Sequence, residues 1–260
     1  MKTEKRTNKK TLIKLFLDLG MIIAFFGVLY SGINIYRIHT EYRAGKDSYK
    51  EIIDKIYQTD ISAKQSNRRN LRKQYFPILK KMNSDFIGWI YMENSAIDYP
   101  FVQTDNNNYY LFHLFNKEYN RSGCVFLDSD NHNDFSDKNT VLYAHNMKNG
   151  TMFHDIVNFK EQEYYDTHKI IEIDTLYDSY DYYPIAGKFT DGYDDYIQIS
   201  FSDEEDFNSY INSFLTDSTF VSDESLSSHD QIVLLSTCAY NVSDGRYALI
   251  GKLVKRTEKE

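Results

Sequence analysis

Hydrophobic and polar positions divide the chain into three regions with different patterns. A continuous apolar run, LFLDLGMIIAFFGVLYSGINIY, extends from Leu15 to Tyr36 and is long enough to cross a hydrocarbon layer of about 30 Å. Between residues 41 and 82, apolar residues recur every three or four positions, which is typical of amphipathic helices. From Asp85 onward, short apolar runs alternate with polar turns, which predicts strands.

The apolar run and its flanks predict a signal anchor. Residues 1–14 hold six basic residues against one acidic residue, a net charge of +5, and basic residues before a span favour a cytoplasmic N-terminus. A cleavable signal peptide is the main alternative, but charged residues follow the run instead of a small-residue cleavage site. A buried core helix is a minor alternative. We expect a cytoplasmic tail at 1–14, a transmembrane segment at 15–36 and the remaining chain outside the cell.

Residues 37–82 are predicted to form a helical stalk that also packs on the main domain. One apolar stripe has helical spacing and comprises Tyr49, Ile52, Ile53, Ile56 and Tyr57. The polar segment Gln58–Asn70 is expected to be a linker. A second helix is expected to start near Pro77, because proline is tolerated in a first turn, and to run through Lys81.

The region from residue 83 to residue 260 is predicted to be one mainly β domain. The expected strands are Phe86–Ile90, Ile97–Val102, Gly123–Leu127, Thr140–Ala144, Ile170–Ile173, Tyr183–Phe189, Tyr196–Ser200 and two runs on either side of Cys238. Helices are expected at Gly150–Phe159 and at Asp203–Leu215, the second with Ser202 as N-cap and Glu205 as its capping-box partner. Many short strands with few helices favour a β-barrel or a sandwich.

Charge and cysteine content exclude several classes of function. The net charge is −8, so the chain after residue 14 carries −8 − 5 = −13, which argues against nucleic-acid binding. Two cysteines, Cys124 and Cys238, are too few for a disulfide scaffold, although they could form one bridge. No zinc-binding or phosphate-binding motif is present, so we predict neither a metal nor a cofactor.

The pattern around Cys238 is the main candidate for chemistry. Cys238 ends one predicted strand and Arg246 begins the next. If the two strands pair, the thiol and the guanidinium meet at one end of the sheet, where a cation favours the nucleophilic thiolate. For Cys238 taken alone, a small buried core residue is the favoured interpretation.

A cysteine nucleophile needs a proton-handling partner, and His145 is a candidate. It follows the predicted strand segment Val141–Ala144, and loops at the ends of strands are where catalytic groups concentrate. Taken singly, each of the seven histidines fits a structural role better than a catalytic one.

Several motifs in a fixed order resemble those of the class B sortases, membrane-anchored cysteine transpeptidases of Gram-positive bacteria. They are NSDFIGWI at 83–90, IDYPFVQ at 97–103, DN and YYL between 105 and 111, GCVFLD at 123–128, YAHNM at 143–147, MF at 152–153, LSTC at 235–238 and Arg246. The helix expected at Asp203–Leu215 is similar to the insertion that separates class B from class A. Ala144 departs from the family pattern, which often has glycine there.

The resemblance implies a closed β-barrel of about eight strands with N-terminal helices, a helical insertion before the cysteine strand and a single N-terminal transmembrane helix. It implies a triad of Cys238 as nucleophile, His145 as general acid and base, and Arg246 as stabiliser of the thiolate and the oxyanion. Tyr143, Ser236 and Thr237 are candidate substrate contacts, with barrel-end packing as the alternative for each.

The implied reaction is cleavage of a C-terminal sorting signal after threonine through a thioacyl-enzyme. The surface protein is then transferred to an amine of a peptidoglycan precursor of the lipid II type. The implied partners are therefore sorting-signal-bearing surface proteins, that precursor and the cell membrane. A membrane-anchored, non-catalytic binding or assembly module of the same fold is the alternative from another class, and a purely hydrolytic cysteine peptidase is a third interpretation.

Overall fold

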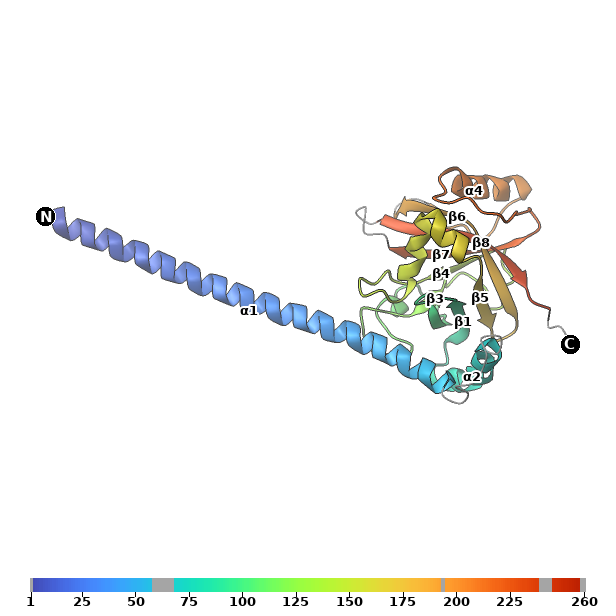
Figure 1. The fold of residues 1–260 in the computed structure, drawn as a ribbon, viewed down its shortest axis with the longest axis horizontal. Coiled ribbons are helices and arrows are strands. Elements are labelled where there is room, and N and C mark those ends of the chain that lie inside the picture. Colours follow the sequence, from blue (N-terminus) through green and yellow to red (C-terminus); the bar gives the residue numbers. More distant parts are fainter. Residues whose placement is uncertain (1, 58–67, 193–194, 239–244, 258–260) are drawn as a thin grey trace. The chain divides into compact units, whose positions relative to one another are not determined.

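The structure is a computed structural model that describes residues 2–57, 68–192, 195–238 and 245–257, with side chains from residue 11 onward. The chain forms two compact units, Met1–Ala44 and Gly45–Glu260. The first contains helix α1 as far as Ala44, and α1 as a whole spans Lys2–Tyr57 (Figure 1).

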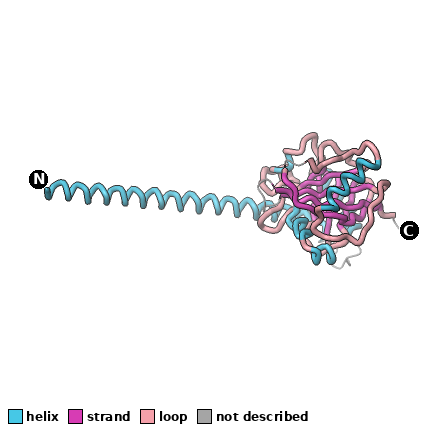
Figure 2. Tube along the Cα trace, turned by 90° about the horizontal axis from the view of Figure 1, so that it is seen from above, coloured by secondary structure: helices cyan, strands magenta, loops and turns pink. Residues whose placement is uncertain are grey.

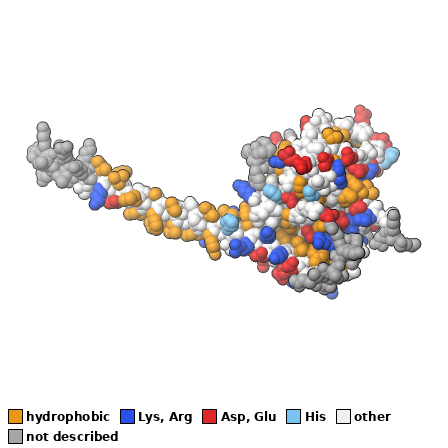
Figure 3. Space-filling view, in the orientation of Figure 1, with side chains coloured by type: hydrophobic (Ala, Val, Ile, Leu, Met, Phe, Trp, Pro, Cys, Tyr) orange, Lys and Arg blue, Asp and Glu red, His pale blue; other side chains and the backbone are white. Residues whose placement is uncertain are grey.

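Among the described residues, one helix is long and apolar enough to cross a membrane, within Thr11–Tyr57. Hydrophobic side chains dominate its surface in Figure 3. The finer division at residues 14, 36 and 82 stays a prediction.

The second unit is built on a closed barrel of eight strands, as the resemblance to the class B sortases implies. The strands are β1 (Phe86–Met92), β2 (Asp98–Val102), β3 (Val125–Leu127), β4 (Asn139–Tyr143), β5 (Ile171–Thr175), β6 (Ser179–Asp191), β7 (Gln231–Cys238) and β8 (Gly245–Lys255). Their order around the barrel is β1-β2-β3-β4-β7-β8-β6-β5. Closure leaves no free sheet edge. Strands lie at the centre of this unit in Figure 2, with helices and loops around them.

Helices and short 3-10 segments surround the barrel. They are α2 (Arg68–Met82), η2 (Tyr109–Leu111), η3 (Phe153–Lys160), α3 (Gln162–Thr167) and α4 (Glu204–Thr216). In Figure 1, α2 and α4 lie at opposite sides of the barrel. The last turns of α1 also belong to this unit. There Tyr49, Ile52 and Ile56 are buried, which confirms the predicted apolar stripe.

Helix α2 begins earlier than predicted. It starts at Arg68, so the expected linker ends before Asn70, and Pro77 lies inside the helix instead of at its start. The earlier linker residues, 58–67, lie outside the described part of the chain. An interior proline removes one backbone hydrogen bond, and packing of Leu71, Phe76 and Leu79 offsets that loss.

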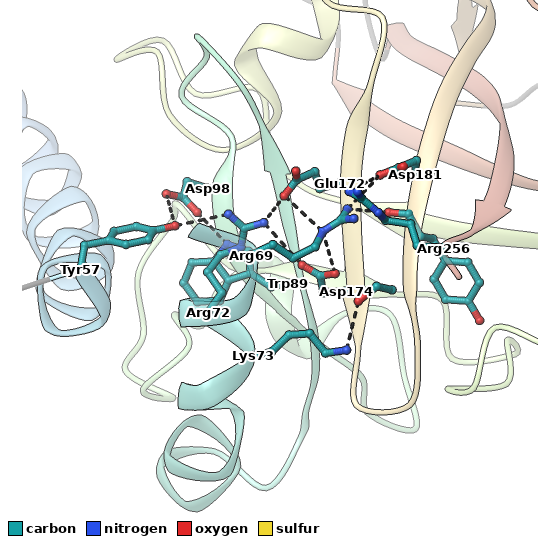
Figure 4. Close-up of polar contacts among 12 residues, drawn as sticks. Tyr57, Arg69, Arg72, Lys73, Trp89, Asp98, Glu172, Asp174, Asp181 and Arg256 are labelled. Carbon is teal, nitrogen blue, oxygen red and sulfur yellow. Dashed lines mark hydrogen bonds and ion pairs between the residues drawn. The ribbon is translucent and has the colours of Figure 1, made fainter. Parts of the chain in front are cut away.

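A buried charge network joins α2 to the barrel (Figure 4). The Arg72 side chain is fully buried and contacts Glu172, and its guanidinium lies 3.5 Å from the Asp174 carboxylate. Arg69 lies 3.1 Å from Asp174 and 3.1 Å from Asp181. Because each buried charge faces an opposite charge, the network fixes α2 against β5 and β6.

The segment Tyr196–Ser200, predicted as a strand, is not one. Its side chains pack against the apolar face of α4 and the outer face of the barrel. Its carbonyls receive hydrogen bonds from Asn139, whose side chain donates to Gln198 at 2.8 Å and whose backbone donates to Ile199 at 3.2 Å. The apolar alternation of this segment therefore reflects packing and not sheet pairing.

Helix α4 is close to the predicted helix but is capped one residue later than expected. Asp203 is the N-cap, and its side chain accepts a hydrogen bond from the Asp206 backbone at 2.9 Å. The Asp206 side chain in turn accepts from the Ser202 backbone at 2.9 Å. Asp206 therefore has the partner role that Glu205 was expected to fill. The predicted apolar face is buried and comprises Phe207, Tyr210, Ile211 and Phe214. The helix expected at Gly150–Phe159 is the 3-10 segment η3 instead and starts later.

Candidate active site

A cavity of about 350 Å³ opens at the end of the barrel where β4 and β7 finish and β8 begins. Its lining comprises Asn107, Asn108, Leu111, Phe126, Tyr143, Ala144, His145, Gly192, Asp195, Tyr196, Ile197, Ser236, Thr237, Cys238 and Arg246. All six residues that the sequence analysis named for catalysis or substrate contact are in this set. The closed barrel brings them together from three strand ends.

Strand pairing places Cys238 beside Arg246. Strands β7 and β8 are antiparallel, and Cys238 and Arg246 are direct cross-strand partners. Residues that are directly opposite in an antiparallel pair have Cβ atoms about 4.5–5.5 Å apart. Cys238 is half-buried and carries a free thiol. This register places the Arg246 side chain beside the Cys238 side chain, and both line the cavity.

His145 comes to the same cavity through the parallel pairing of β4 with β7. Tyr143 is the partner of Ser236, and the Ala144 backbone donates to the Ser236 carbonyl at 3.3 Å, so His145 follows just beyond the paired ends. His145 Nε2 lies 2.8 Å from the Leu111 carbonyl oxygen. Because a carbonyl only accepts, Nε2 carries the proton, and Nδ1 is the nitrogen left to gain or lose one.

Burial lowers the pKa of His145 below its ordinary value of 6.5, and the positive charge of Arg246 lowers it further, against the opposing effect of the hydrogen bond to Leu111. The imidazole is therefore mainly neutral at pH 7, which leaves Nδ1 able to accept a proton.

Asn146 connects the segment that carries His145 to strand β7. Its side-chain nitrogen donates to the Cys238 carbonyl at 3.0 Å, and its side-chain oxygen lies 2.8 Å from His154 Nδ1. Asn146 is buried, so these bonds hold the Cys238 backbone to the segment that carries His145. The sequence analysis quoted Asn146 only as part of a motif. Its position beside His145 was the one available signal for a role at the site.

Two polar networks support the walls of the cavity. Tyr143 donates to an Asp128 carboxylate oxygen at 2.7 Å, and Asn107 donates to the same oxygen at 3.1 Å. The Tyr196 and Ser236 hydroxyls are 2.8 Å apart. Burial and the bond to Asp128 raise the pKa of Tyr143, which keeps it a neutral donor. Tyr196 escaped the sequence analysis because it lay in a segment interpreted as a strand.

Helix α4 contacts the cavity wall indirectly, through a residue that lines it. None of its residues belongs to the described cavity lining. Tyr210 on its buried face donates to the Tyr196 carbonyl at 3.0 Å, and Tyr196 lines the cavity.

Cys124 lies apart from this site, inside the barrel wall. It is fully enclosed, and its sulfur lies 3.7 Å from the Pro100 carbonyl oxygen. Burial raises the pKa of its thiol to about 12, so it is protonated and unreactive at neutral pH. Both cysteines are free, which contradicts the disulfide considered from the sequence. In the described part of the chain, no group of three or more His, Cys, Asp and Glu residues is arranged to hold a metal ion.

No protein-family model matches the chain. Sortase B of Listeria monocytogenes is 32% identical over 254 residues, which is 94% of this chain and 99% of that protein. The chain belongs to the sortase B family. Members of this family are cysteine transpeptidases, so this class B sortase is an enzyme and not a binding module.

Solved sortase B structures agree in fold along most of the chain. The Staphylococcus aureus sortase B–substrate complex has a TM-score of 0.75 at 28% identity, covering 84% of this chain and 100% of that one. A sortase B complexed with triglycine has a TM-score of 0.72 at 29% identity, covering 83% and 99%. The matches support an eight-stranded sortase barrel preceded by a long apolar helix.

Proposed function

We propose that this class B sortase cleaves a C-terminal sorting signal after threonine and transfers the upstream protein to an amine of a peptidoglycan precursor. The observation that carries the proposal is the cross-strand pairing of Cys238 with Arg246 at the cavity that His145 also lines. The relatives solved with a substrate and with triglycine support a peptide donor and a glycine-bearing acceptor.

In the first half of the reaction, Cys238 Sγ attacks the carbonyl carbon of the scissile peptide bond. The thiol proton passes to His145 Nδ1, and the carbon–nitrogen bond then breaks. His145 returns the proton to the departing amine, so the products are a thioester and a free C-terminal fragment. The neutral imidazole described above is in the correct state to accept that first proton.

In the second half, the acceptor amine attacks the thioester carbon. His145 Nδ1 takes a proton from the amine and delivers it to the departing Cys238 sulfur, which regenerates the thiol as a new amide bond forms. Water in place of the amine gives a free carboxylic acid instead. The family therefore needs a site that favours amine over water.

Arg246 has two roles in this scheme. Beside the thiol it favours the thiolate, and beside the reacting carbon it donates hydrogen bonds to the oxyanion that forms in each half-reaction. We assign substrate contacts to Tyr143, Ser236 and Thr237, since all three line the cavity. The buried Thr237 hydroxyl makes no hydrogen bond to a described residue.

The apolar part of α1 supports a membrane location for the enzyme. We propose that Leu15–Tyr36 is a single-pass anchor with a cytoplasmic N-terminus and that the catalytic domain lies outside the cell. A removed signal sequence would give the same apolar helix in the sequence. Protease added to intact protoplasts distinguishes the topologies, because an outer domain is digested and an inner one is protected.

The activity is tested by mass spectrometry of the purified full chain with a panel of sorting-signal peptides. We expect a mass increase equal to the peptide up to its threonine, located on Cys238, and conversion to an amide product when triglycine is added. An adduct on another residue, or no adduct with any peptide, would contradict the proposal. Cys124→Ala serves as the matched control and should behave like the unaltered chain.

A further inference from the structure

Two aromatic side chains form an exposed surface immediately outside the cavity. Phe112 is 45% exposed and Tyr119 is 68% exposed. Their rings are stacked, with centroids 6.3 Å apart and planes inclined by 14°. Neither residue lines the cavity, so together they make a separate apolar surface, which we call the Phe112–Tyr119 platform. Contiguous exposed apolar surface marks binding sites more often than scattered single residues do.

Backbone hydrogen bonds hold the platform in place. His113 and Tyr119 form an antiparallel bridge, and the Asn120 backbone donates to the Phe112 carbonyl at 2.9 Å. The turn between the two rings is closed by a bond from the Leu114 backbone to the Glu118 carbonyl at 2.9 Å. A rigid surface loses little conformational entropy when a ligand binds to it.

The platform adjoins the catalytic histidine. The Phe112 ring centroid is 6.4 Å from that of His145. Leu111, the residue before Phe112, lines the cavity and accepts the hydrogen bond from His145 Nε2. The platform therefore lies next to the cavity, on the side where His145 and Leu111 line it.

The proposed reaction decides what this surface can bind. The acyl donor fills the cavity as a thioester on Cys238, whereas the acceptor amine must come within hydrogen-bond reach of His145, which takes its proton. The remainder of the acceptor has to extend away from the occupied cavity. The platform is an exposed apolar surface that lies outside the cavity lining and has its Phe112 ring centroid 6.4 Å from that of His145.

We propose that Phe112 and Tyr119 form the acceptor subsite and bind the peptide that follows the nucleophilic amine. This inference rests on the proposed function. The flat planes of successive peptide groups pack on the ring faces, which favours glycine-rich acceptors because they lack side chains. An extended peptide advances about 3.3 Å per residue, so one residue does not span the 6.4 Å from His145 to Phe112, and three residues do.

The test is the length dependence of aminolysis in the full chain. Thioacyl-enzyme is formed with one sorting-signal peptide, and the ratio of amide product to hydrolysis product is measured with glycinamide and with triglycinamide. We expect the unaltered enzyme to use triglycinamide better. Phe112→Ala and Tyr119→Ala should each lower triglycinamide use by about three- to tenfold, with glycinamide use and the rate of thioacyl formation unchanged.

Two controls make the result decisive. Tyr177→Ala removes an aromatic side chain that is 60% exposed in the turn between β5 and β6, and it should change nothing. Phe112→Tyr should retain the preference for triglycinamide. An unchanged preference for triglycinamide over glycinamide in Phe112→Ala would overturn the proposal. Equal losses in the rate of thioacyl formation and in the use of both amides would also overturn it, because Phe112 would then only support His145.

An equilibrium measurement separates this proposal from the proposed function. Triglycinamide is titrated into the full chain carrying Cys238→Ala, with and without Phe112→Ala, and the shifts of aromatic resonances are followed by NMR. Weaker binding after loss of Phe112 would support the acceptor subsite even if no sorting peptide were ever cleaved. Equal binding in the two variants would overturn it.

Discussion

Cys238 and Arg246 are direct partners across two antiparallel strands, although seven residues separate them in the chain. Because both residues lie in paired strands, the barrel fixes the position of the Arg246 backbone relative to that of Cys238. It also places Arg246 where its charge lowers the pKa of His145. Arg246 thus lies beside Cys238 and also lowers the pKa of His145.

The two cysteines should differ sharply in reactivity. A charged methanethiosulfonate at neutral pH should modify one thiol per chain in the native protein, because Cys238 is partly exposed and Cys124 is enclosed with a pKa of about 12. Intact-mass analysis measures the stoichiometry. Cys238→Ala should abolish labelling and Cys124→Ala should leave it at one. Labelling of Cys124 in the native chain would contradict the assignment of its thiol as buried and protonated.

Aminolysis should lose rate on the acidic side of neutrality. His145 must be neutral to take a proton, and its pKa lies below 6.5, so the rate per unprotonated acceptor amine should be at its full value at pH 7 and fall as the pH drops through that lower pKa. The pH dependence of amide formation from preformed thioacyl-enzyme, divided at each pH by the fraction of acceptor amine that is unprotonated, measures this. An acidic limb centred above pH 7 would show that another group controls the step.

Arg246→Gln should raise the pKa of His145. The substitution removes a positive charge that disfavours the imidazolium, so an NMR titration of the labelled ring should shift to higher pH. His132 is the internal reference, because its pKa is raised by Asp137 in an exposed loop and should not respond. Identical His145 titrations in both proteins would mean that the two side chains do not interact.

Arg246→Lys should also be poorly tolerated, although it keeps the charge. Arginine offers a planar fork of donors to an oxyanion, and lysine offers a single flexible ammonium. Loss of one such donor reduces the rate by about 10²–10³ in other acyl-transfer enzymes. Single-turnover acylation measures the effect. Near-normal acylation would indicate that Arg246 acts only through its charge.

Breaking the charge network between α2 and the barrel should lower the free energy of unfolding without changing the residues that line the cavity. Arg72 is fully buried against Glu172 and Asp174, so Arg72→Ala leaves acidic groups without their partner and should cost about 3–5 kcal/mol. Denaturant unfolding followed by the fluorescence of the single tryptophan, Trp89, gives the free energy. Lys55→Ala, which removes an exposed ion pair, should leave the free energy of unfolding almost unchanged and serves as the control. Comparable losses in the two variants would contradict a stabilising role for the buried network.

The sequence was sufficient for features that depend on local pattern. Apolar length predicted the long N-terminal helix, and helical spacing predicted the buried stripe of Tyr49, Ile52 and Ile56. Strands β7 and β8 were recognisable as apolar runs, and ordered motifs indicated the family. These features can be predicted locally, because they depend on the spacing of apolar side chains along a helix or strand and on the burial of apolar surface.

Only the tertiary structure decided which long-range partners meet. Tyr196–Ser200 has the composition of a strand, and packing against α4 takes the place of sheet pairing. Pro77 would end a helix by local preference, and buried contacts keep it inside α2. Phe112 and His145, about 30 residues apart in the chain, have ring centroids 6.4 Å apart. The hydrogen bond from Asn146 to Cys238 joins segments about 90 residues apart. Such contacts depend on closure of the barrel, because a local pattern specifies what a segment can bury and not which distant segment covers it.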